Sequence, residues 1–395
     1  MRTTLKLGGA AVALAIVLTG CGDDDDDGGS SSEVEVQQSE DCATRTQEAR
    51  DAGELEEVSL QLQWVSQAQF AGYYAAVAEC YYVDEGLDVN IIEGGVDIVP
   101  QDVLASGDVD YAISWVPKVL GSIEQGAGIT DVAQIFERSA TTQISFKGKD
   151  ITEAADFKDK NVGSWGYGNE WELFAGMQSA DVGVKDINLV QQAFDMNAFL
   201  AGDIDAAQAM TYNEYAQVLE TVNPDTGELY TPEDLNVINW NDVGTAMLQD
   251  AIWATTEKLS DPDYEEQTVA FIKASIKGWA FVRDNPEEAA AIVAESGSEL
   301  GQSHQLWMAN EVNKLIWPST NGVGIIDEAA WAQTVEIALN TENETGATII
   351  SEEPPASAYT NEYVEQALAE LEDEDVDTIG ADYEPIEVTL EEGGK

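Results

Sequence analysis

Short apolar runs alternate with helical periodicities over most of the chain. Alternating apolar positions predict a first strand at Val58–Trp64, and the apolar residues from Phe70 to Tyr81 then recur at the spacing of one helix face. The same alternation predicts further strands at 87–92, 111–114, 132–136, 143–146, 162–165, 187–191, 206–210 and 252–255. Because short strands that alternate with helices usually form parallel sheets, the pattern predicts the α/β class.

The pattern becomes almost entirely helical after Thr255, with helices expected at 264–283, 286–295, 302–316, 328–339 and 362–371. Two α/β lobes with a helical return are typical of a two-lobed binding protein, and the chain is expected to cross between lobes near Thr141 and Asp250. We therefore expect the first part of lobe 1 at 57–141, lobe 2 at 142–250, the mostly helical return of lobe 1 at 251–371 and a loose acidic tail at 372–395.

The first 56 residues differ in character from the rest of the chain. Arg2 and Lys6 precede an apolar run, Leu7–Leu18, which is far shorter than the roughly 20 residues that span a bilayer. The tetrad Leu18-Thr19-Gly20-Cys21 resembles the lipobox of bacterial lipoprotein signal peptides. The resemblance implies that residues 1–20 are removed and that Cys21 carries the lipid; the alternative is an ordinary signal peptide with an incidental cysteine. Residues 21–56, acidic and rich in Ser and Gly, are expected to form a tether.

The charge balance is strongly acidic and narrows the range of partners. The chain has 17 Lys and Arg against 76 Asp and Glu, a formal net charge of -59. Such a surface repels nucleic acid and anionic headgroups, so contact with the membrane is expected through the lipid anchor alone. A hydrophobic content of 44% argues against a disordered acidic protein. The acidity indicates a solvated carboxylate surface of the kind expected in a high-salt habitat.

Cysteine and histidine usage argues against a metal or haem site. With Cys21 lipidated, Cys42 and Cys80 remain in an oxidising compartment, either as a disulfide or as two buried thiols. The chain has no CxxC motif and a single histidine, His304. We therefore expect neither a metal nor a cofactor.

Four stretches carry a family resemblance, which extends over roughly residues 57–345. They are Trp64–Tyr74 with Tyr82–Val89, Gly163–Glu170, Gly202–Glu214 and Gly244–Asp250. Together they resemble the thiamine-pyrimidine branch of the nitrate/sulfonate/taurine group of solute-binding proteins. The resemblance implies a two-lobed, periplasmic-binding-protein-like (type II) fold with a ligand between the lobes.

Aromatic residues are expected where strands end at the ligand. Trp64, Trp165 and Tyr212 follow predicted strands, and ligands of open α/β sheets bind beyond the carboxyl ends of strands, where flat rings can stack on a heterocycle. The full set of candidate ligand-binding residues is Trp64, Tyr73, Trp115, Trp165, Glu170, Tyr212, Asn213 and Glu214. Core packing is the alternative for each ring, and helix capping is the alternative for Glu170, Asn213 and Glu214.

Gly166 and Gly168 precede a predicted helix, where backbone amides could hold an anion. Since no Lys or Arg is near them in sequence, a tight turn is the preferred interpretation. Arg138, which follows a strand, is expected to pair with a carboxylate in a structural role.

The resemblance implies a substrate-binding lipoprotein of an ABC importer rather than an enzyme. It would capture a hydroxymethyl- or formylaminomethyl-pyrimidine, work outside the cytoplasm as a lipid-anchored monomer, and deliver the ligand to a permease and its ATPase. The alternatives are a riboflavin receptor, then a sulfonate, taurine or nitrate receptor, and a surface lipoprotein without a transport role. A related pyrimidine synthase would need a Lys and a His in the first lobe and a Cys-rich loop, and Gln67–Glu79 contains neither Lys nor His.

Overall fold

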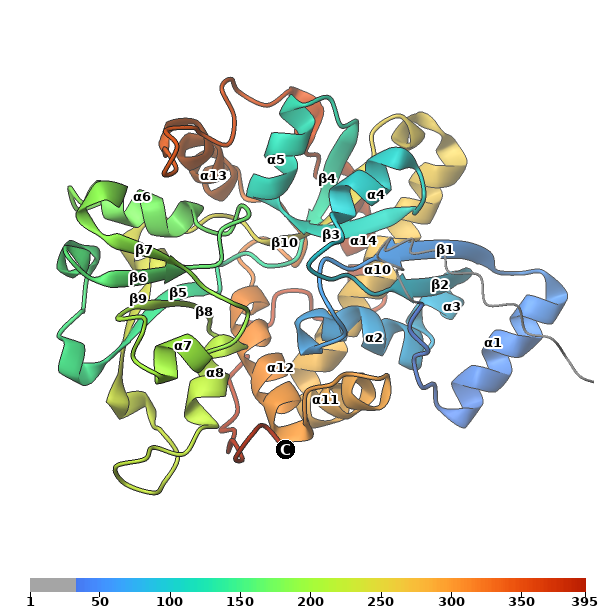
Figure 1. The fold of residues 1–395 in the computed structure, drawn as a ribbon. Helices are drawn as coiled ribbons and strands as arrows, with labels where there is room; N and C mark the ends of the chain where they lie inside the picture. Colours follow the sequence, from blue (N-terminus) through green and yellow to red (C-terminus); the bar gives the residue numbers. More distant parts are fainter. Residues whose placement is uncertain (1–32) are drawn as a thin grey trace, which may run out of the picture. The chain divides into compact units, whose positions relative to one another are not determined.

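The computed structural model describes residues 33–395, and the strands of this part of the chain form three sheets (Figure 1). The five-stranded sheet has the order β2-β1-β3-β10-β4, from β1 (Glu56–Gln61), β2 (Leu87–Ile92), β3 (Tyr111–Trp115), β4 (Ile129–Gln134) and β10 (Asp250–Thr255). The order of the three-stranded sheet is β8-β5-β9, from β5 (Thr141–Phe146), β8 (Ala207–Met210) and β9 (Leu235–Asn239). The third sheet pairs β6 (Asn161–Ser164) with β7 (Asn188–Gln191).

The sheets divide the described residues into two lobes. We call the part around the five-stranded sheet lobe 1 and the part around the other two sheets lobe 2. The chain leaves lobe 1 after β4, builds lobe 2 from β5 to β9, and returns to lobe 1 with β10. In Figure 1 the strands β5 to β9 lie on the left, and β1 and β2 lie on the right.

The strands are only partly parallel, so the prediction of parallel sheets is wrong for the strands nearest the crossovers. β1 pairs in parallel with β2 and β3, and β6 pairs in parallel with β7. In contrast, β10 is antiparallel to β3 and β4, and β5 is antiparallel to β8 and β9. β10 and β5 enter their sheets from the other lobe rather than through a crossover helix, and the helix is what makes neighbouring strands parallel. The strand β9 was not predicted.

The helical return predicted after Thr255 is present. The helices are α1 (Glu40–Ala52), α2 (Ala71–Ala78), α3 (Tyr81–Asp84), α4 (Pro100–Ser106), α5 (Val116–Glu124), α6 (Trp171–Ser179), α7 (Asn197–Leu200), α8 (Glu214–Leu219), α9 (Trp240–Val243), α10 (Pro262–Asp284), α11 (Pro286–Glu295), α12 (Gln302–Ile316), α13 (Glu328–Asn340) and α14 (Glu362–Asp373). The long helix α10 packs on α2, where a Cβ on Gly278 would lie 1.9 Å from the carbonyl oxygen of Gly72. Glycine at 278 therefore sets how closely these two helices approach.

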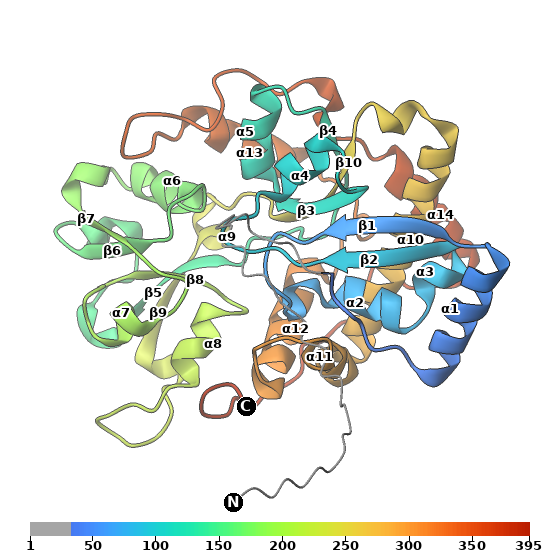
Figure 2. The same ribbon diagram turned by 45° about the vertical axis from the view of Figure 1, so that its right-hand side comes forward.

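The acidic tail after α14 is folded against the protein, so its predicted looseness is wrong. The backbone N–H of Ile386 donates to Asn310 Oδ1 at 2.9 Å, and the N–H of Gly393 donates to the carbonyl of Glu220 at 3.1 Å. Leu390 packs against the apolar cluster of lobe 2. Residues 374–395, which we call the C-terminal strap, thus run along α12 and end beside α8 (Figure 2). Its anchors are single residues too widely spaced to give a periodic signal.

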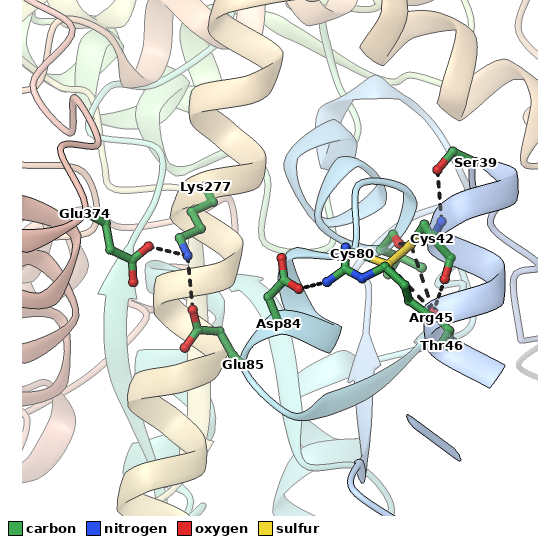
Figure 3. Close-up of polar contacts among 10 residues, drawn as sticks. Ser39, Cys42, Arg45, Thr46, Cys80, Asp84, Glu85, Lys277 and Glu374 are labelled. Carbon is green, nitrogen blue, oxygen red and sulfur yellow. Dashed lines mark hydrogen bonds and ion pairs between the residues drawn. A yellow bond between two sulfur atoms is a disulfide. The ribbon is translucent and has the colours of Figure 1, made fainter. Parts of the chain in front are cut away.

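The predicted tether is also folded from residue 33 onward. The N–H of Val34 donates to the carbonyl of Ile91 at 2.9 Å, and residues 40–52 form α1. Cys42 on α1 forms a disulfide with Cys80, which precedes α3 (Figure 3). Arg45 pairs with Asp84 beside the disulfide, and Arg50 pairs with Asp88 at 2.5 Å. Residues 1–20 and Cys21 lie outside the described residues.

Lysine side chains join lobe 1 to the segment after α14. Lys277 on α10 lies 3.1 Å from Glu85 and 2.6 Å from Glu374, and Figure 3 shows it between the two carboxylates. Lys273, one turn earlier, contacts the same two carboxylates. Among the helices of residues 33–395, none combines the length and the apolar character needed to cross a membrane.

Replacing both Cys42 and Cys80 by serine is expected to lower the free energy of unfolding. The two cysteines are 38 residues apart, and closing a loop of that length removes chain entropy worth about 4 kcal/mol from the unfolded state. Urea unfolding at one fixed high salt concentration measures the difference. Addition of a reducing agent should destabilise the wild type and leave the double variant unchanged. A double variant within 1 kcal/mol (roughly the error of such extrapolations) of the wild type would contradict the prediction.

Candidate ligand-binding cavity

A cavity of about 690 Å³ lies between the two lobes. Lobe 1 contributes the residues after β1, the 95–101 loop and the junction of β3 with α5; lobe 2 contributes the residues after β6, β7 and β8. These are the carboxyl ends of strands, where open α/β sheets bind their ligands. The volume falls within the range of small-molecule sites, roughly 300–1,000 Å³.

Aromatic rings from both lobes form walls of the cavity. Trp64 of lobe 1 contacts Phe194 of lobe 2 with ring centroids 4.8 Å apart, and Trp165 lies 6.2 Å from Phe194 with its ring plane inclined by 19°. Trp115 and Tyr212 line the cavity as well. The sequence did not point to Phe194, because it is a single aromatic in a polar loop and follows no strand directly.

Six of the eight predicted ligand-binding residues line the cavity: Trp64, Trp115, Trp165, Tyr212, Asn213 and Glu214. Tyr73 does not, because its ring packs edge-on against Trp279 inside lobe 1 with centroids 5.7 Å apart. All residues of its helix α2 except Val77 are buried, so burial does not mark one face of this helix as the face toward the cavity. Glu170 is not part of the lining either, and its Oε2 accepts from the N–H of Gly168 at 2.9 Å. Glu170 is the N-cap residue of α6, but its side chain closes the preceding turn and makes no capping hydrogen bond to the helix.

Hydrogen bonds fix the side chains of Asn213 and Glu214. The Asn213 amide is held in part by His304 of lobe 1. The Oδ1 of Asn213 lies 3.1 Å from His304 Nε2 and accepts from Gln217 Nε2 at 3.2 Å. His304, on α12, also contacts Glu220 through Nδ1 at 2.8 Å. The Nδ2 of Asn213, a residue of the cavity lining, donates to Glu214 Oε1 at 3.4 Å and retains a second N–H. Glu214 accepts from the N–H of Met210 at 3.0 Å, and burial raises the pKa of its carboxyl.

A buried carboxylate, Asp250 at the start of β10, organises the polar residues of lobe 1. Its Oδ1 accepts from Gln63 Nε2 at 2.8 Å and from Trp115 Nε1 at 2.6 Å, and its Oδ2 accepts from Gln69 Nε2 at 2.8 Å. All three donors belong to residues that line the cavity. Burial raises the pKa of Asp250 to about 7, against the opposing effect of the hydrogen bonds and of Lys118. The sequence signal that was missed is a charged residue at the first position of a buried strand.

Lys118 brings a cation into the cavity, contrary to the expectation that no Lys or Arg lies near Gly166 and Gly168. Its Nζ lies 4.8 Å from the centroid of the Trp115 ring, and its Cγ would be 3.7 Å from a Cβ on Gly168. Burial lowers the pKa of the Lys118 ammonium to about 8, although Asp250 and Glu170 attract it. Lys118 and the turn at Gly168 are far apart in sequence, and they come close only because the two lobes face each other.

Among residues 33–395, Arg138 does not line the cavity and pairs with no carboxylate. Its guanidinium donates to the carbonyls of Leu315 and Pro318, at 3.2 and 2.7 Å, so its role is structural through the backbone of lobe 1. In residues 33–395, no group of three or more His, Cys, Asp and Glu side chains is placed to hold a metal ion.

The family described as NMT1/THI5 like matches residues 67–289, more than half of the chain. The chain belongs to the NMT1/THI5-like family. The resemblance found in the sequence is thereby confirmed. The match contains the residues after β3, β6, β7 and β8, which supply most of the cavity lining of this NMT1/THI5-like protein, whereas Gln63 and Trp64 lie just before it.

Individual relatives of this NMT1/THI5-like chain carry different ligand names. It is 26% identical over 261 residues to the formylaminopyrimidine-binding protein of Halalkalibacterium halodurans, covering 65% of this chain and 75% of that protein. It is 23% identical over 325 residues to the riboflavin-binding protein RibY of Chloroflexus aurantiacus, covering 78% of this chain and 86% of that protein.

A solved structure confirms the predicted fold class. The putative periplasmic sulfonate-binding protein SsuA of Methylobacillus flagellatus superimposes with a TM-score of 0.56 at 18% identity, covering 85% of this chain and 99% of that one. The NMT1/THI5-like chain therefore has the two-lobed fold of periplasmic binding proteins.

Replacing Asp250 by asparagine is expected to flatten the pH dependence of stability. The pKa of Asp250 is about 7 in the folded protein against 3.8 ordinarily, so the folded state binds more protons between these values and this group's contribution to stability falls as pH rises from 4 to 7. The Asp250→Asn variant lacks this loss, which amounts to up to about 4 kcal/mol. Urea unfolding at pH 4 to 8, at constant high salt, measures it.

The variant can keep its hydrogen bonds if the side-chain amides of Gln69 and Gln67 turn over, since Gln67 donates to Gln69 in the wild type. Asp181→Asn, at an exposed position, is the matched control and should follow the wild-type curve. Parallel curves for wild type and Asp250→Asn would show that this carboxyl is not the buried group described above.

Proposed function

We propose that this protein is the substrate-binding component of an ABC importer and that its ligand is a thiamine-precursor pyrimidine, hydroxymethyl- or formylaminomethyl-substituted. The observation that carries the proposal is a cavity with aromatic walls from both lobes and amide and carboxyl groups between them. The name of the formylaminopyrimidine-binding relative supports the same ligand class. A permease and its ATPase are the partners that such a role requires.

The chemistry of an aminopyrimidine matches the polar groups of the cavity. Its ring nitrogens need donors, which the Asn213 amide can supply, and its exocyclic amine needs acceptors, which Glu214 can supply. The flat ring can stack on Trp64 or Trp165. A ligand that touches both lobes stabilises the closed arrangement through its differential affinity for it.

The N-terminal sequence supports a proposal for the cellular location of the protein. We propose that Cys21 is lipidated after removal of residues 1–20, and that the protein acts outside the cytoplasm as a lipid-anchored monomer. Globomycin, which blocks lipoprotein signal peptidase, should then cause the precursor to accumulate. A Cys21→Ser variant should lose its membrane association in cell fractionation.

Riboflavin is a second candidate ligand, because the cavity is large enough to hold it. A cavity of about 690 Å³ exceeds what a single pyrimidine ring requires and leaves room for a three-ring system. The relative named as a riboflavin-binding protein supports this alternative. Sulfonate, taurine and nitrate are weaker candidates, because Lys118 is the one cationic side chain that lines the cavity in the described part of the chain.

The structure changes which residues argue against the alternative of a pyrimidine synthase. Lys118 is a lysine of lobe 1 at the cavity, so the missing lysine no longer argues against an enzyme. The histidine does: His304 lies on α12, is buried against Glu220 and Asn213, and does not line the cavity. A receptor role therefore remains our proposal.

Calorimetric titration and thermal unfolding with hydroxymethylpyrimidine, formylaminomethylpyrimidine, thiamine, riboflavin and taurine test the function. We expect tight binding and a raised Tm with a pyrimidine, since a ligand that binds only the folded state stabilises it. A raised Tm with riboflavin alone would make the protein a flavin receptor. No response to any of these compounds would favour a surface lipoprotein without a transport role.

Replacing Trp165 by leucine is expected to weaken pyrimidine binding about tenfold, because it removes the stacking ring while keeping apolar volume. Calorimetry with formylaminomethylpyrimidine gives the dissociation constants. Tyr230→Leu is the matched control, since Tyr230 contacts Phe146 away from the cavity and should not affect binding. Equal affinity of Trp165→Leu and the wild type would remove Trp165 from the binding site.

A further inference from the structure

Lys118 occupies a position that is unfavourable for a cation in the absence of a ligand. It is the third residue of α5, whose first residue is Val116 and whose N-cap is Trp115. The N-terminus of a helix carries partial positive charge, so an ammonium group there is repelled. Burial at the cavity adds to this cost and lowers the pKa of Lys118 to about 8. A residue placed against both effects calls for a compensating contact.

The protein itself supplies little of that contact. Within residues 33–395, the Lys118 Nζ makes no hydrogen bond and no ion pair, and it lies over the Trp115 ring, 4.8 Å from the ring centroid. The carboxylates that attract it are engaged elsewhere, since Asp250 accepts from three side chains and Glu170 accepts from the Gly168 N–H. The ammonium therefore lines the cavity with its N–H groups unused.

We propose that Lys118 donates a hydrogen bond to an acceptor oxygen on the side arm of the bound heterocycle, and that it selects an acylated arm over a free amine. The inference rests on the proposed function and adds the chemistry of the arm. A formyl carbonyl accepts from the ammonium, whereas a protonated aminomethyl group brings a second positive charge against it. A site built around an unused, partly buried donor discriminates against ligands that leave it unpaired.

Several other polar groups of the cavity are already engaged within the protein. Asn213 and Glu214 belong to the β8–α8 junction, and the Gln63, Gln69 and Trp115 side chains donate to Asp250. Lys118 faces the turn at Gly168 on lobe 2, close enough that a Cβ there would contact its Cγ at 3.7 Å. The selecting donor of lobe 1 thus lies next to the glycine turn of lobe 2, where the arm of a bridging ligand would be enclosed.

The test compares two probes with three forms of the protein by calorimetry at pH 7. The probes are 4-amino-5-formylaminomethyl-2-methylpyrimidine and the corresponding free 5-aminomethyl compound. The proteins are the wild type, Lys118→Met, and Lys147→Met, which removes an equal charge at an exposed site of lobe 2. We expect the wild type and Lys147→Met to favour the formyl compound at least tenfold, in line with one charged hydrogen bond. Lys118→Met should lose that preference.

Thermal unfolding without ligand separates a binding role from a structural one. Because the ammonium is partly buried near a helix N-terminus, Lys118→Met should unfold at the same Tm as the wild type or higher. If Lys118→Met does not fold, Lys118→Gln, which keeps a neutral donor, takes its place and should retain part of the preference. A Lys118→Met protein that is folded and keeps the wild-type preference for the formyl compound overturns the inference.

The outcomes also separate this inference from the proposed function. Pyrimidine binding that is unaffected by Lys118→Met leaves the function standing and removes the lysine from it. If only riboflavin binds, its ring carbonyls serve as the acceptors, and unchanged riboflavin affinity in Lys118→Met overturns the role of the lysine. Binding of none of these compounds to the wild type overturns both.

Discussion

The cavity depends on the buried carboxylate of Asp250. Its two oxygens accept from Gln63 and Gln69, which follow β1, and from Trp115, the last residue of β3. A single group on β10 thus fixes the ends of two neighbouring strands. A buried carboxylate is costly unless its oxygens are hydrogen-bonded, and three donors at 2.6–2.8 Å meet that requirement. The same bonds hold the Trp115 ring in the orientation in which Lys118 lies over it. The aromatic and the cationic parts of lobe 1 are thus positioned by one polar centre.

The crossovers between the lobes are held by a comparable pair of side chains. Glu172 accepts from Ser139 Oγ at 2.9 Å and from the N–H of Met247 at 2.6 Å, which ties both crossover segments to α6. Gln249 accepts from the N–H of Ala140 at 2.8 Å and donates to Thr141 Oγ1 at 2.7 Å. Because Gln249 immediately precedes Asp250, the hinge and the polar centre of the cavity share one stretch of backbone. The contacts that fix the crossovers and those that order the cavity therefore lie on adjacent residues.

The sequence was informative where local pattern determines position. Apolar alternation locates strand ends, and this placed Trp64, Trp165 and Tyr212 at the cavity. The prediction for Tyr73 was wrong, because almost every residue of its helix α2 is buried and no single face of the helix identifies the cavity. Lys118 was missed because its closeness to Gly168 arises only when the two lobes meet. Likewise, the C-terminal strap is held by isolated contacts such as Ile386 with Asn310, which leave no period in the sequence.

Repulsion between surface charges and hydrogen bonding in the cavity act over different distances, so salt affects them differently. With a net charge of -59, the exposed carboxylates repel one another until salt screens them, and the screening length is about 3 Å at 1 M salt. The bonds around Asp250 are shorter than that length and are shielded from solvent ions by burial. An interaction between Lys118 and a ligand oxygen would be similarly local and shielded. High salt can therefore stabilise the acidic surface without weakening recognition in the cavity, and a neutral ligand bound by hydrogen bonds and stacking suits such a protein better than a highly charged one.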